Sequence, residues 1–152
     1  FENVARENVE TTIVLNEIMD VLDSFIETWK PQGMAHNDFY DDQLIVTPDG
    51  RMALVDFEEA GPGDPLLDVG NFLAHLRWTT RFGSSEAAEH CAEYRRLFRD
   101  KALERFGWRS RDLDLREAMC LFRDCTNMVR QPREDWEYRL REGLLLVQET
   151  LG

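Results

Sequence analysis

The stretch MAHNDFYDDQLIVTPDGRMALVDFEEAGPGDP, residues 34–65, carries eight acidic side chains in a segment that otherwise has the pattern of short strands. Acidic residues are disfavoured in strands, and like charges held close together destabilise a fold. Something should compensate for this repulsion, and a bound cation is the simplest candidate. The fold and the candidate chemistry of the chain both depend on this segment.

The middle of the segment predicts a β-hairpin. The apolar runs QLIV (43–46) and RMALVDF (51–57) flank the sequence TPDG at 47–50, in which Pro fixes φ, Asp bonds its own backbone and Gly accepts a positive φ. Counted from this turn, Gln43 and Asp56 lie at similar heights on neighbouring strands. Antiparallel partners are about 5 Å apart, so an amide and a carboxylate meet here.

This pair of oxygen ligands suits Mg²⁺, which binds one or two protein carboxylates and completes its shell with water and phosphate. Asp38 lies on the loop just before the hairpin and is expected to face the same spot. Because Asp38 is not needed as a metal ligand, it is free to act as a base or a positioning group.

The rest of the chain predicts helices, because apolar residues recur at steps of three and four between caps and breakers. We expect a loop at 60–65, and the expected helices are residues 8–29, Pro65 to about Phe82, Ser84 or Ser85 to about Phe106, a helix capped by Ser110 and reaching about Arg130, and a last one opened by Pro132. The predicted fold class is α+β, mostly α, with one small hairpin.

The composition of the chain limits the kinds of partner that we expect it to bind. The chain has 152 residues, which indicates one domain, and a net charge of −12, which argues against nucleic acid or anionic lipid and permits cationic substrates or metal ions. Its three cysteines have no paired spacing, so a reducing, cytoplasmic location is expected. No apolar run approaches the length of a membrane span, and we expect no signal peptide.

Two motifs resemble those of aminoglycoside phosphotransferases and choline kinases, within the protein-kinase-like superfamily. HNDFYDDQ (36–43) resembles their catalytic loop, and LVDFEEAGPGDPLLDVGNFLAHL (54–76) resembles their metal-binding strand and the helix that follows. The resemblance is specific over residues 34–76 and weaker beyond. It implies that residues 1–152 form the large C-terminal lobe of a kinase-like fold.

The resemblance also implies residue roles. Asp38 would accept or orient the proton of the acceptor hydroxyl, and Asp56 would bind Mg²⁺ that bridges the nucleotide phosphates. Gln43 would be the second metal ligand, although the family usually has Asn there, and the extra methylene would shift the metal or weaken its binding. His36 would brace the loop, and Asp68 would hold that loop from the following helix.

Three further acidic residues stay open between a functional role and a solvated loop: Asp41, Asp42 and Glu58, each of which could contact substrate or a second metal ion.

The features of an ATP-binding small lobe are not found in this sequence. There is no Gly-x-Gly-x-x-Gly, and neither Lys30 nor Lys101, the two lysines, lies on a strand in front of a helix. We expect the N-terminal ATP-binding lobe to lie upstream and to be absent from this chain, as in a truncation or a processed product. The isolated chain is then expected to be inactive.

The leading hypothesis is an ATP- and Mg²⁺-dependent phosphotransferase lobe that transfers the γ-phosphate to a hydroxyl of a small molecule of the aminoglycoside, amino alcohol or sugar type. The acidic surroundings of Asp38 would suit a cationic acceptor. Two alternatives remain: a non-catalytic kinase-like module that binds a ligand or partner, and a metal-dependent hydrolase. Metal hydrolase sites gather more His and carboxylate ligands than this segment offers.

Overall fold

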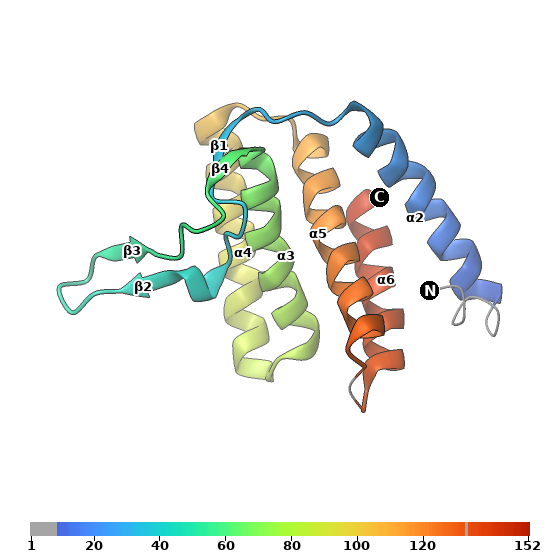
Figure 1. The fold of residues 1–152 in the computed structure, drawn as a ribbon. Helices are drawn as coiled ribbons and strands as arrows, with labels where there is room; N and C mark the ends of the chain where they lie inside the picture. Colours follow the sequence, from blue (N-terminus) through green and yellow to red (C-terminus); the bar gives the residue numbers. More distant parts are fainter. Residues whose placement is uncertain (1–8, 133) are drawn as a thin grey trace.

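The computed structural model describes residues 9–132 and 134–152. The described part is mostly helical, and two small antiparallel strand pairs lie beside the helices (Figure 1). The helices are α2 (Val9–Thr28), α3 (Pro65–Phe82), α4 (Ser85–Phe106), α5 (Ser110–Arg130) and α6 (Trp136–Leu151). These bounds confirm the predicted helices to within a few residues, although residue 8 lies outside the described part. The predicted opening of the last helix by Pro132 is wrong, because α6 begins at Trp136 after Asp135. None of the described helices is long and apolar enough to cross a membrane.

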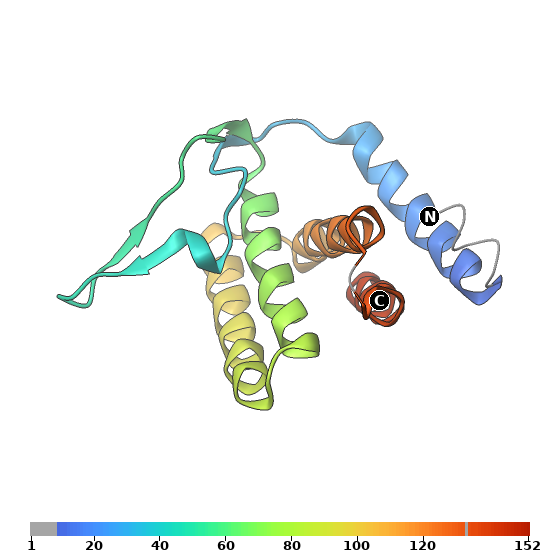
Figure 2. The same cartoon turned by 60° about the horizontal axis from the view of Figure 1, so that its bottom comes forward.

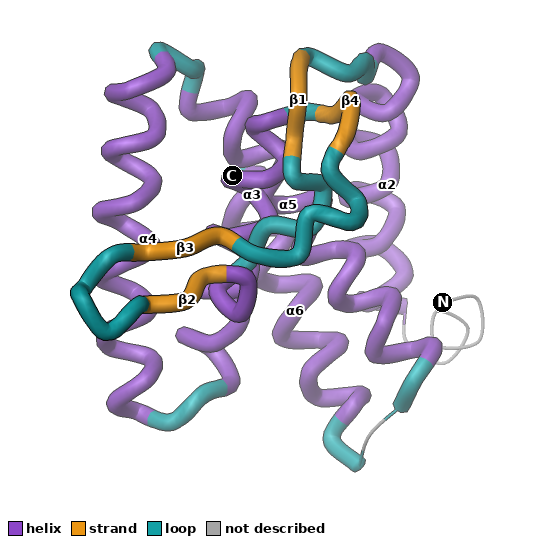
Figure 3. The backbone as a smooth tube through the Cα atoms, turned by 60° about the vertical axis from the view of Figure 1, so that its left-hand side comes forward, coloured by secondary structure: helices purple, strands orange, loops and turns teal. Residues whose placement is uncertain are grey.

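The predicted hairpin is confirmed. Strands β2 (Leu44–Val46) and β3 (Met52–Leu54) pair antiparallel, with Leu44 opposite Leu54. Its turn is closed by the Gly50 amide, which donates to the Thr47 carbonyl at 2.9 Å. The hairpin projects away from the helices in Figure 1, and Figure 3 shows its two strands side by side.

A second strand pair corrects the expectation of a loop at 60–65. Strand β4 (Gly61–Gly63) pairs antiparallel with β1 (Gly33–Ala35), with Gly33 opposite Gly63 and Ala35 opposite Gly61. These two strands consist mostly of glycine and proline, which have low strand propensity. The sequence therefore lacks the hydrophobic alternation from which a strand is predicted. The pair places the two motifs of the candidate site side by side.

Capping explains most helix boundaries. Asp64 caps α3 by accepting from the Leu66 amide at 3.0 Å, and Ser84 caps α4 by accepting from the Ala87 amide at 3.3 Å. The predicted cap at Ser110 is wrong, because Ser110 is the first residue of α5 and its hydroxyl contacts Asp114 instead.

Helix α3 lies at the centre of the body, between α4 on one side and α5 on the other, and α6 packs on α5 (Figures 1 and 2). The larger apolar core joins α2, α3, α5 and α6 around side chains such as Ile18 and Leu121, while Leu73 and Leu113 belong to a smaller core shared with α4. Gly70 permits the close approach of α3 and α5, because a Cβ there would lie 2.8 Å from the Arg116 backbone.

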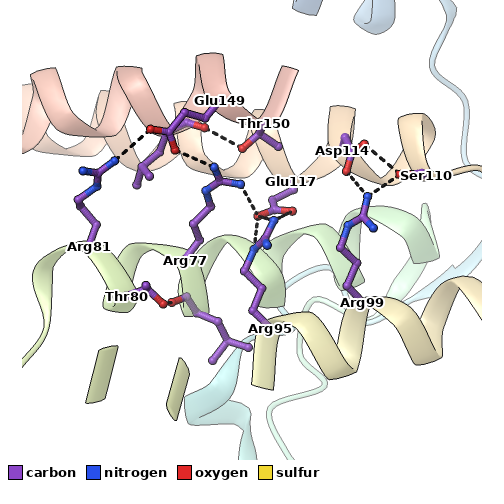
Figure 4. Close-up of polar contacts among 12 residues, drawn as sticks. Arg77, Thr80, Arg81, Arg95, Arg99, Ser110, Asp114, Glu117, Glu149 and Thr150 are labelled. Atoms are coloured by element: carbon purple, nitrogen blue, oxygen red, sulfur yellow. Dashed lines mark hydrogen bonds and ion pairs between the residues drawn. The ribbon is translucent and has the colours of Figure 1, made fainter. Parts of the chain in front are cut away.

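A buried ion pair links three helices. The side chain of Glu117 on α5 is fully buried, and both its oxygens accept from Arg95 of α4 at 2.8 Å, while Arg77 of α3 lies 3.8 Å away (Figure 4). Burial raises the pKa of Glu117, and the charges of Arg95 and Arg77 act against that rise. The pair therefore depends on a carboxylate enclosed by guanidinium groups.

Candidate functional site

The loop that follows β1 is held by the first turn of α3. The backbone amides of His36 and Asn37 donate to the two carboxylate oxygens of Asp68, at 2.7 and 2.8 Å. Asn37 adopts a positive φ of 67°, a conformation that Asn tolerates better than most residues, and its side chain donates to the Glu59 carbonyl at 2.8 Å. One carboxylate thus fixes the start of the loop that carries Asp38.

The imidazole of His36 is buried and lies against the hairpin. Its Nε2 is 2.8 Å from the Val55 carbonyl oxygen, and its ring centroid is 5.1 Å from that of Phe57. Nδ1 has no hydrogen-bond partner among residues 9–132 and 134–152. These contacts suit a bracing role, because the bond to Val55 ties the loop to the strand end that precedes Asp56.

Gln43 and Asp56 meet at the root of the hairpin. The Gln43 side chain is buried, and its Nε2 donates to Asp56 Oδ2 at 3.3 Å. The Val55 amide donates to the Gln43 carbonyl at 3.0 Å, which continues the hairpin ladder by one bond. The structure therefore brings together the two side chains that counting from the turn placed at similar heights, although the residue opposite Gln43 in the ladder is Val55.

Their placement on strands, however, is wrong. Gln43 is the last residue of the short 3₁₀ helix η1 (Asp41–Gln43), and Asp56 lies two residues beyond β3 with a φ of 62°. A non-glycine residue with positive φ costs about 1 kcal/mol, and such strain is often found at functional sites. Because Asp tolerates this conformation better than most residues, the chain can leave the ladder here with a carboxylate at the bend.

Asp38 is half-buried and shares an electrostatic environment with the pair at the hairpin root. The pKa of Tyr40 is evidence for this shared environment. Desolvation raises the pKa of its phenol, and nearby negative charges raise it further. Those charges belong to Asp38, Asp42, Asp56 and Asp41. The carboxylates of the loop and of Asp56 thus act on one phenol, which is the crowding that a cation would relieve.

The three remaining acidic candidates are exposed. Asp41 Oδ1 is 3.7 Å from Nδ1 of His75, whose ring stacks on Tyr40 with centroids 4.6 Å apart. Asp42 acts on Tyr40 only through its charge, and Glu58 lies on the exposed turn after Asp56. Within the described residues, no group of three or more His, Cys, Asp or Glu could hold a metal ion.

The donor set fits magnesium bound together with phosphate. One carboxylate oxygen of Asp56 and the amide oxygen of Gln43 are hard ligands of the kind that Mg²⁺ takes, and this ion usually keeps water and phosphate in its remaining positions. The contact at 3.3 Å uses the amide nitrogen of Gln43, so the amide must turn over to present its oxygen.

Sequence reasoning missed a partly buried chain of hydrogen bonds that runs from Arg123 through Asn71 to the loop of Asp38. Asn71 of α3 is buried, its Nδ2 donates to the Phe39 carbonyl at 3.0 Å, and its Oδ1 accepts from Arg123 at 2.7 Å. The signal was a polar residue three positions after Asp68, on the same face of a helix and inside an apolar run. Asn71 and Asp68 together fix the backbone on both sides of Asp38.

Asp64 does more than cap α3. Its side chain is fully buried, and Oδ2 accepts from Arg116 Nε and Nη2 at 2.9 and 2.8 Å and from Trp29 Nε1 at 3.2 Å. This carboxylate therefore joins the end of α2, the start of α3 and the middle of α5. A buried charge with several donors is stabilised in a way that a simple cap is not.

A family model described as the phosphotransferase enzyme family matches residues 3–113. The chain belongs to the phosphotransferase enzyme family. The matched range of this phosphotransferase chain contains the loop around Asp38, the pair at the hairpin root and the start of α3. Searches of curated proteins and of solved structures gave no match.

Proposed function

We propose that this phosphotransferase chain is the large lobe of an ATP- and Mg²⁺-dependent small-molecule kinase that phosphorylates a hydroxyl group. The observation that carries the proposal is the contact between Gln43 and Asp56 beside the loop of Asp38. Phosphoryl transfer needs mainly position and charge neutralisation, and this arrangement offers hard oxygen ligands and a nearby carboxylate.

Each side chain has a distinct role in this proposal. Asp56 and Gln43 would hold Mg²⁺, which supplies charge neutralisation at the phosphates. Asp38 would orient the acceptor hydroxyl and take its proton, at a position fixed from below by Asp68 and Asn71. Because both of these supports are on α3, the loop and that helix form one rigid unit.

We also propose that an ATP-binding small lobe, outside this chain, packs on the hairpin side. Large apolar side chains are exposed there and would be covered by such a lobe: Met34 is 73% exposed, Val46 70%, Met52 65% and Phe57 58%. Singly exposed apolar residues are common, but three on or directly after the hairpin, together with Met34 on β1, are consistent with an interface.

The acceptor is proposed to be a small alcohol, and a cationic one is favoured by the exposed carboxylates of Asp41 and Asp42 and by the net charge of −12. The same charge disfavours nucleic acid and anionic membranes as partners. A cytoplasmic location remains our proposal, based on the cysteine content.

The metal site can be tested on the 152-residue chain with Mn²⁺, which takes the same oxygen ligands as Mg²⁺ and broadens nearby NMR signals. We expect broadening centred on Gln43 and Asp56 that is lost in Asp56→Asn and kept in the matched control Asp49→Asn, a carboxylate at the hairpin tip. Equal broadening in both variants would contradict the assignment.

Catalysis is tested by γ-phosphate transfer in the protein extended by its upstream lobe, offered aminoglycosides, amino alcohols and sugars. Asp38→Asn is expected to lower the rate by about a hundredfold or more. The isolated chain is expected to show no ATP turnover, and robust turnover would contradict the two-lobe proposal. Ligand binding without any transfer would favour the non-catalytic module.

A further inference from the structure

A cleft lies away from the hairpin, between the end of α2 and the start of α5, which lie at the same end of the helical body in Figure 1. Its volume is about 790 Å³, within the range of small-molecule sites. None of Asp38, Gln43 and Asp56 lines it. The cleft is therefore separate from the proposed catalytic centre.

Three aromatic side chains form part of its wall: Phe25 from α2, Trp29 from the residue after α2, and Trp108 from the turn before α5. Two of these rings are held in place. Trp29 Nε1 donates to the buried Asp64 at 3.2 Å, and Trp108 stacks on Phe106 with ring centroids 4.5 Å apart. Rings fixed in this way offer apolar faces to a planar ligand with little loss of side-chain entropy.

The same cleft is locally cationic in a strongly acidic protein. Four of the residues lining it are basic and two are acidic: Lys30, Arg109, Arg111 and Arg116 against Asp20 and Asp112.

Ion pairs neutralise only part of that charge. Arg109 pairs with Asp112 at 2.8 Å, and Arg116 pairs with Asp64 at 2.8 Å. Lys30 forms no ion pair with another described residue, and Arg111 donates to the Leu151 carbonyl, which carries no charge. Lys30 and Arg111 outnumber Asp20, the lining carboxylate that forms no ion pair with another described residue, so a positive surplus remains in an aromatic cleft.

We infer that this cleft binds a small planar aromatic anion, such as an aryl carboxylate. The rings of Trp29 and Trp108 would contact its aromatic face, while Lys30 and Arg111 would neutralise its acid group. Arg116 contributes a guanidinium plane whose Cζ already lies 4.4 Å above the centroid of the Phe25 ring. Charge complementarity and volume together select an anion over a neutral or cationic ring.

The probe is 2-naphthoate, compared by titration calorimetry with 2-naphthylmethylammonium and 2-naphthamide, which keep the ring system and change the charge. We expect saturable binding of 2-naphthoate to one site, and binding of the other two that is about tenfold weaker or more. NMR should show shifts of the indole signals of Trp29 and Trp108 while those of Trp78 and Trp136, in the larger core, stay in place.

Two lysine variants test which positive charge binds the acid group of the probe. Lys30→Ala is expected to weaken 2-naphthoate binding by about fivefold, because it removes a partly solvated charge contact. Lys101→Ala, which removes an exposed lysine on α4 outside the cleft, is the matched control and should leave the affinity unchanged.

Three results would overturn the inference: no saturable binding of 2-naphthoate at millimolar concentration, equal affinity for the three probes, or equal effects of the two lysine variants. None of these measurements requires phosphotransfer, so failure here is distinguishable from failure of the proposed kinase activity.

Discussion

Replacing Glu117 with glutamine tests how the helical body is held together. The variant Glu117→Gln keeps the size of the side chain but removes the buried charge that faces the guanidinium of Arg95 at 2.8 Å and that of Arg77 at 3.8 Å. Because the Glu117 side chain is fully buried, water cannot take the place of the lost carboxylate beside the two guanidinium groups. Breaking a buried ion pair by removing one partner costs about 3–5 kcal/mol, and we expect a loss at the lower end, since the amide oxygen still accepts one bond.

The matched control is Glu149→Gln. Its carboxylate also binds Arg77, at 2.9 Å, but its side chain is 52% exposed, so the same chemical change should cost about 0–1 kcal/mol. Figure 4 shows both carboxylates reached by arginines from α3. The two variants therefore differ mainly in burial.

Urea unfolding followed by circular dichroism measures both losses, and repeating it at high salt separates them further. Salt should shrink the small effect of Glu149→Gln and leave that of Glu117→Gln nearly unchanged, because screening acts on exposed charges. If the two free energies of unfolding fall by the same amount, the reasoning from burial is refuted.

Three further predictions concern the core, the loop and the helix contact. Burial raises the pKa of the Cys120 and Cys125 thiols to about 12, so both should resist alkylation until the chain unfolds. Each pKa in the folded protein lies above the ordinary value of 9.0, so the free energy of unfolding should fall as the pH rises above 9, by about 1.4 kcal/mol per pH unit for each thiol. Replacing both cysteines with alanine should flatten that slope in urea titrations at a series of pH values. Asp68→Asn should accelerate hydrogen exchange of the His36 and Asn37 amides, which donate to Asp68, by about tenfold. Unchanged exchange would contradict the proposal that Asp68 fixes the start of the loop. Gly70→Ala should cost about 1–3 kcal/mol in thermal unfolding, because its Cβ would lie 2.8 Å from backbone atoms of α5, whereas Gly61→Ala, with no atom nearer than 4.0 Å, should cost less.

The helices and the hairpin were predictable because their signals are local. Apolar residues recur with the helical period, Asp64 and Pro65 announce the start of α3, and the sequence at 47–50 dictates a tight turn. Counting from the same turn placed Gln43 and Asp56 at similar heights, but the register puts Val55 opposite Gln43, and the bend at Asp56 brings its carboxylate to the Gln43 amide. Local rules gave the elements themselves, although they misplaced the cap of α5 at Ser110 and put Gln43 on a strand rather than in η1.

The rest depends on contacts between distant segments. The pairing of β1 with β4 joins stretches rich in glycine and proline, which carry no strand pattern. The cap that Asp64 forms with Leu66 is a local contact, but its bonds to Trp29 and Arg116 span 35 and 52 positions, and no spacing rule predicts them. The bend at Asp56 also escaped prediction, because positive φ at a non-glycine residue is set by tertiary contacts.

The position of Gln43 and Asp56 at the base of the hairpin has a practical consequence. The far end of the hairpin is closed by its own bonds, including one from the Thr47 amide to the Arg51 carbonyl at 2.8 Å. Strain introduced at that end is absorbed by an exposed turn before it reaches the base. A fluorescent label or a short tag inserted between Pro48 and Gly50 should thus report on the approach of another body without displacing the oxygens that the chemistry needs.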